Sequence, residues 1–140
     1  MPYCTQADIT GQLPEMELAG LTDDMSGLMV VASVLSQAIV SADAVIDSYL
    51  SGVYSTPLAV VPEVIIGISV DLTIWNLFTR RGIENESRRQ LQQDAIKLLA
   101  DIAKGIIVLS SDRAASISTS HAVLSSSADR IFSAGVLDTY

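Results

Sequence analysis

Between Glu63 and Arg80 the chain carries a single charged residue, Asp71. Apolar side chains recur there at three- and four-residue steps and form two stripes that cover most of a helix circumference. Pro62 suits the start of that helix, because its missing N–H donor is not needed there. A helix that is apolar nearly all round is buried nearly all round, so this one is either the central element or turns a face to another subunit. The stripes are Ile65, Ile68, Leu72 and Trp75, and Ile66, Val70, Ile74 and Leu77.

Two capping patterns occur earlier in the chain. Thr5 with Asp8 three residues later forms a capping-box pattern, which predicts a short helix that Gly11 ends. Thr22, followed by Asp23 and Asp24, predicts the cap of a long amphipathic helix of roughly seven turns. The apolar positions of that helix recur at helical spacing. They are Val31, Val34, Leu35, Ala38, Ala42, Val45, Ile46, Tyr49 and Val53.

The apolar pattern after Arg89 predicts one more helix, so the expected fold is all-α. A further amphipathic stripe predicts a helix from Leu91 to Ala103 with its C-terminal cap at Gly105. Hydrophobic residues make up 49% of the chain and aromatic residues 5%, so the core must be aliphatic. We therefore expect a small helical bundle of about four helices, one of them long and central. Residues 1–109 form this helical domain, and the serine-rich residues 110–140 are expected to be an extended tail that docks on a partner.

Charge is divided unevenly along the chain. No lysine or arginine precedes Arg80, whereas nine acidic residues do, and the formal net charge is −8. Binding to nucleic acid or to an anionic membrane needs clustered cations, so both are disfavoured. The acidic half either complements a mildly basic half on a neighbouring subunit or keeps a hydrophobic chain in solution.

Groups that could carry catalysis or bind a metal are few. His121 is the only histidine, and it lies among serines without a second histidine or an oriented third group. Asp43 and Asp47 share a helix face, but such a pair is more often solvated than metal-binding. Cys4 is the only cysteine, which excludes an internal disulfide. We expect no enzyme activity, no cofactor and no metal site. The uncharged residues 25–42 lack the positive flanks of a membrane span.

Five blocks of the sequence follow one another in an order that is more specific than any block alone. They are Tyr3-x-Thr5-x-x-Asp8, Leu21-Thr22-Asp23, residues 46–58, residues 94–105 and residues 130–140. In these blocks the chain resembles the head–tail adaptor family of Mu-like phages and prophages. The resemblance covers nearly the whole chain.

The resemblance implies a structural virion protein. Its members would form a ring, expected to be twelvefold, in the neck between the portal protein and a downstream neck or tail protein. The ring would line the DNA channel and let genomic DNA pass without specific binding. The protein would occupy the host cytoplasm during assembly and the virion afterwards. We expect the interface residues to be Arg130, Phe132, Leu137 and Tyr140 in the tail, with Trp75 and Tyr54 in the domain.

Two other classes of protein fit the same helices. One is a small helical protein-binding or regulatory module that is not associated with a virion. The other is an enzyme with an acidic site built on Asp43, Asp47 and Asp71, which would need metal-dependent activity that is lost on substitution by alanine.

Overall fold

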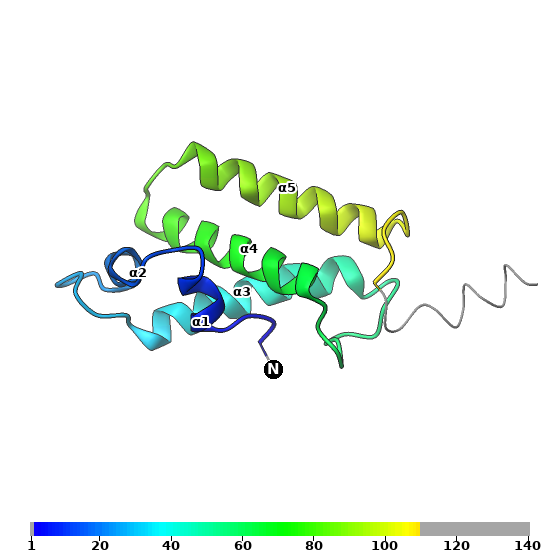
Figure 1. Ribbon diagram of the computed structural model, residues 1–140, viewed down its shortest axis with the longest axis horizontal. Coiled ribbons are helices and arrows are strands. Elements are labelled where there is room, and N and C mark those ends of the chain that lie inside the picture. The colour runs from blue at the N-terminus through cyan, green and yellow to red at the C-terminus, as the bar shows by residue number, and fades with distance from the viewer. Residues whose placement is uncertain (1, 110–140) are drawn as a thin grey trace, which may run out of the picture. The chain divides into compact units, whose positions relative to one another are not determined.

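The computed structural model describes residues 2–109, which form five helices and no strand. The all-α prediction is confirmed. Two short helices precede three long ones along the chain, so the bundle has three long helices where the sequence predicted one. Figure 1 shows their arrangement. The helices are α1 (Gln6–Thr10), α2 (Glu15–Thr22), α3 (Ala32–Leu50), α4 (Glu63–Arg81) and α5 (Glu86–Ala103).

Helix α4 is the central element of the domain. It contacts α1, α2, α3 and α5, and in Figure 1 it lies between α5 and α3. Its side chains Ile65, Ile74 and Leu77 are completely buried, although they point in different directions around the helix. Each such side chain contributes about 1.5–3 kcal/mol of burial free energy. Of the two alternatives for this apolar helix, the central position is therefore the one observed.

Several predicted helix ends are confirmed. The Thr5 hydroxyl accepts a hydrogen bond from the Asp8 amide, and the Asp8 carboxylate accepts one from the Thr5 amide at 2.8 Å. Gly105 ends α5 as predicted, with a φ of +81°, a conformation that residues with a Cβ rarely adopt. Gly82, with a φ of +68°, ends α4 in the same way, although it was not among the predicted helix ends.

The predicted cap at Thr22 is wrong, because Thr22 ends a helix instead of beginning one. Its hydroxyl donates to the Leu18 carbonyl at 3.0 Å, one turn back, and the chain then runs irregularly as far as Val31. Helix α3 begins only at Ala32 and has 19 residues, about five turns. Helix α2 was not among the predicted helices, although Pro14 at its N-terminus and acidic residues in its first turn are typical start signals.

Candidate interaction surface

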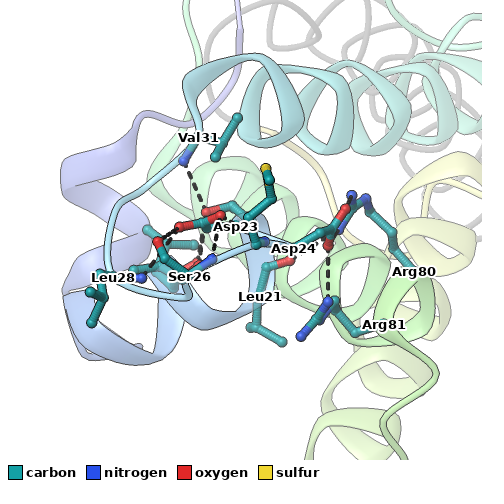
Figure 2. A network of polar contacts seen from close by, with 12 residues as sticks. Leu21, Asp23, Asp24, Ser26, Leu28, Val31, Arg80 and Arg81 are labelled. Carbon is teal, nitrogen blue, oxygen red and sulfur yellow. Dashed lines mark hydrogen bonds and ion pairs between the residues drawn. The ribbon is translucent and has the colours of Figure 1, made fainter.

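The irregular segment between α2 and α3, residues 23–31, is a fixed loop; we call it the methionine loop. The Asp23 carboxylate accepts hydrogen bonds from the amides of Met25 at 3.0 Å, Ser26 at 3.2 Å and Leu28 at 3.3 Å. It also accepts a hydrogen bond from the Ser26 hydroxyl. Figure 2 shows these groups converging on one carboxylate. The Ser26 hydroxyl and the backbone amides hold the pKa of Asp23 well below its usual range.

Two further contacts hold the loop to the helices. The Val31 amide donates to the Thr22 hydroxyl at 3.0 Å, which closes the loop at the start of α3. Arg80 and Arg81 at the end of α4 both bind Asp24, through Nη1–Oδ1 distances of 3.0 and 2.9 Å. The hydrogen bond from Arg80 lowers the pKa of Asp24 and raises that of the arginine. The loop is therefore tied to both helices that flank it and to α4.

The methionine loop presents large apolar side chains to solvent. Met25 is 98% exposed, Leu28 69% and Met29 73%, and Met16 on α2 is exposed as well. Isolated exposed apolar residues are ordinary, but several on one ordered loop mark a contact surface. The flexible thioether of methionine adapts to irregular partner surfaces. This loop is one half of the candidate interaction surface.

A groove along α3 is the other half. Its volume is about 630 Å³. Four exposed residues of α3 line it at steps of four, so they form one ridge along the helix. They are Ala32, Ser36, Val40 and Ala44. Leu35, Ile39 and Pro57 also line the groove, as do Asp43 and Asp47.

A polar network fixes the wall of this groove. The Tyr3 amide donates to Asp43 at 3.1 Å, and the Tyr3 hydroxyl donates to Asp47. The same hydroxyl accepts from the Leu58 amide at 3.1 Å, and the Ser69 hydroxyl donates to Asp43 at 3.0 Å. Burial, with the hydrogen bond to Asp47, raises the pKa of Tyr3 to about 12, and burial raises the pKa of Asp43.

The two aspartates predicted to be a solvated pair, Asp43 and Asp47, are thus half-buried and take part in holding the chain start to α3 and α4.

Asp71 lies apart from that network; one of its oxygens is buried without a hydrogen-bond partner among residues 2–109. Burial raises the pKa of Asp71, and the charge of Arg88 opposes that rise. Within the same residues no three histidine, cysteine or acidic side chains lie close enough to hold a metal ion. The expectation that the chain is not an enzyme stays a prediction.

The predicted interface residues fall in different places. Tyr54 is buried, and Trp75 is half-buried beside a pocket of about 300 Å³ that Ile83 and Arg89 also line. The four tail residues, Arg130, Phe132, Leu137 and Tyr140, lie outside the described residues, as does His121. Their role stays a prediction.

Sequence reasoning missed both the methionine loop and the α3 groove. Residues 25–31 were expected to form the first turns of the helix whose cap was predicted at Thr22. Gly27, which adopts a φ of +67° in the structure, was the available signal for a loop. No sequence signal indicated the groove, because the chain start and Pro57 that border it are distant in sequence from α3.

These observations describe a small all-α domain with an ordered apolar loop and an open apolar groove. None of the helices within residues 2–109 has the length and apolar character needed to cross a membrane. The family model described as "Bacteriophage Mu, Gp36" matches residues 3–126. The chain therefore belongs to the bacteriophage Mu Gp36 family. No curated protein matches it.

Proposed function

We propose that this protein is a structural virion protein that forms an adaptor ring in the neck of a tailed phage. The ring would join the portal protein to a downstream neck or tail protein. The observation that carries this proposal is the match to the Mu Gp36 family over residues 3–126, which includes all five helices. Family membership supports a phage protein. The adaptor role rests in addition on the resemblance of the five ordered sequence blocks to the head–tail adaptor family of Mu-like phages.

The surface of the domain supports a role in assembly. A protein that works by joining others needs fixed apolar surface for partners to cover, and the methionine loop and the α3 groove supply it. Both are held by hydrogen bonds, so little conformational entropy is lost when a partner binds.

The distribution of charge supports a passive role toward DNA. Glu15, Glu17 and Glu63 are exposed, and all lie in the half of the sequence that lacks lysine and arginine. Carboxylates that face a DNA channel would repel phosphates, so the genome would slide past without binding.

Deletion of the gene from the phage or prophage that encodes the chain tests the proposal. We expect heads filled with DNA and free tails to accumulate separately, and the wild-type gene supplied on a plasmid to restore joined particles. A plasmid that encodes the Val60→Ala variant, which alters one exposed side chain, serves as a matched control and should restore them too. Normal joined virions in the absence of the protein would contradict the proposal and favour the regulatory module.

A further inference from the structure

We propose that one face of α4, marked by Val64, Gly67 and Asp71, receives an arginine or lysine side chain of a partner protein. The cation pairs with the Asp71 carboxylate, and its aliphatic stem lies across Gly67. The three residues stand at steps of three and four, so they share one face of the helix. The inference rests on the proposed function, because the partner is sought among the proteins of the assembled particle.

The carboxylate of Asp71 is not paired. Among residues 2–109 it makes no hydrogen bond or ion pair, and one of its oxygens is buried. Arg88 is the cation whose charge acts on it, but the Nη2 of Arg88 donates to the Gln12 carbonyl at 3.3 Å. Burial outweighs the charge of Arg88, because the pKa of Asp71 is raised. The charge of Asp71 is therefore only partly compensated, and it costs stability.

Gly67 lies one turn before Asp71, inside α4. Glycine in the middle of a helix is less favourable than alanine, because it loses more backbone freedom on folding. A Cβ placed on Gly67 would meet no other part of the described chain within 4 Å. Packing within residues 2–109 therefore does not require a glycine at this position.

Two residues that oppose the stability of the domain thus stand one turn apart on its central helix. Choices that oppose the fold occur mainly at functional sites, where they are retained for a purpose other than stability. Gly67 lets another chain approach the α4 backbone closely, and Asp71 offers it a charge. Val64, which is 37% exposed, adds apolar surface beside them.

A cationic side chain on an aliphatic stem matches all three residues. A carboxylate only accepts hydrogen bonds, and an ammonium or guanidinium group only donates them. Lysine and arginine cover apolar surface with their stems while the charged end reaches a partner. An acidic or purely apolar partner would bury Asp71 further and leave its charge unpaired, which is unfavourable. Charge complementarity therefore selects a basic partner.

Variants of the full chain, purified and also supplied to a phage that lacks the gene, test this site. Asp71→Asn and Gly67→Leu should not lower the thermal unfolding midpoint of the isolated protein, yet each should reduce its copies per purified particle about tenfold. The matched controls are Asp94→Asn, at an exposed carboxylate of α5, and Gly52→Leu, at an exposed glycine with equally open surroundings. Both controls should be incorporated like the wild type.

Photo-cross-linking identifies the occupant. With p-benzoylphenylalanine in place of Val64, irradiation of purified particles should give an adduct whose partner peptide carries an arginine or lysine beside the cross-link. The same cross-linker in the Asp71→Asn chain is the control and should give little of that adduct. A partner peptide without a cation at that place would overturn the proposed occupant.

The remaining outcomes separate this inference from the adaptor role. Incorporation of Asp71→Asn and Gly67→Leu at the wild-type level would overturn the site and leave the adaptor role intact. A lower unfolding midpoint in both variants would show that the two residues serve the fold, which also overturns the site. Absence of the wild-type protein from purified particles would refute the adaptor role, and with it the partner sought here.

Discussion

The hydroxyl of Tyr3 donates a hydrogen bond to the carboxylate of Asp47, 44 residues further along the chain. The same hydroxyl accepts a hydrogen bond from the Leu58 amide at 3.1 Å. One side chain therefore joins the start of the chain to α3 and to the connection between α3 and α4. The groove wall depends on this join, because Asp47 and Pro57 both line the groove.

Tyr3→Phe should lower the free energy of unfolding by about 1–3 kcal/mol, because it leaves a carboxylate oxygen and a buried amide without their partner. Urea unfolding followed by the fluorescence of the single tryptophan, Trp75, measures this loss. Tyr49→Phe is the control, since the Tyr49 hydroxyl makes no hydrogen bond within residues 2–109, and it should unfold like the wild type.

Ile74→Ala should lower the free energy of unfolding by about 2–5 kcal/mol, because it opens a cavity in a completely buried part of α4. The exposed Val60→Ala should change it by less than about 0.5 kcal/mol. Similar urea midpoints for the two variants would contradict the central position of α4.

Asp71→Asn should raise the free energy of unfolding at neutral pH, by on the order of 1 kcal/mol at most, because it removes a half-buried charge. The folded pKa of Asp71 lies above the ordinary 3.8, so the folded state takes up its proton first. The cost of the charge is present in full above the folded pKa and diminishes as pH falls toward 3.8. The advantage of the variant over the wild type should diminish in the same range. An advantage that does not change with pH would show that the Asp71 charge is not its source.

Asp23→Ala should release the methionine loop without unfolding the bundle. The carboxylate fixes three backbone amides of the loop, so hydrogen exchange at Met25, Ser26 and Leu28 should accelerate while α4 amides stay protected. Asp24→Ala is the control: it breaks the exposed ion pairs with Arg80 and Arg81 but leaves those amides bonded. Equal exchange in the two variants would mean that Asp23 does not order the loop.

Much of the helical fold could be predicted from the sequence because its signals are local. The capping box at Thr5 and the glycine at 105 act within one turn of the helix ends that they fix. The apolar circumference of α4 predicted extensive burial for the same reason, and of the two alternatives that it allowed, a central place or a face toward another subunit, the structure shows the central place. The stripe of α3 was less well predicted: Ile39 and Leu50 are buried and Val45 is exposed, because the partners that cover α3 come from elsewhere in the chain.

The interaction surface could not be predicted in the same way, because distant segments form it. Asp24 is recognised by Arg80 and Arg81, 56 and 57 residues later, and Asp43 by Tyr3, 40 residues earlier. The sequence predicted that the side chains at Thr22 and Asp23 would bind backbone amides, and in the structure they do. They were assigned to a helix start because the same residue types also fix loops.

A cryo-electron microscopy reconstruction of the virion neck tests the adaptor role most directly. The reconstruction should show a ring of copies of the five-helix domain against the portal, with α4 at the centre of each copy. A neck reconstructed at side-chain detail whose components all belong to other chains would contradict the role proposed here.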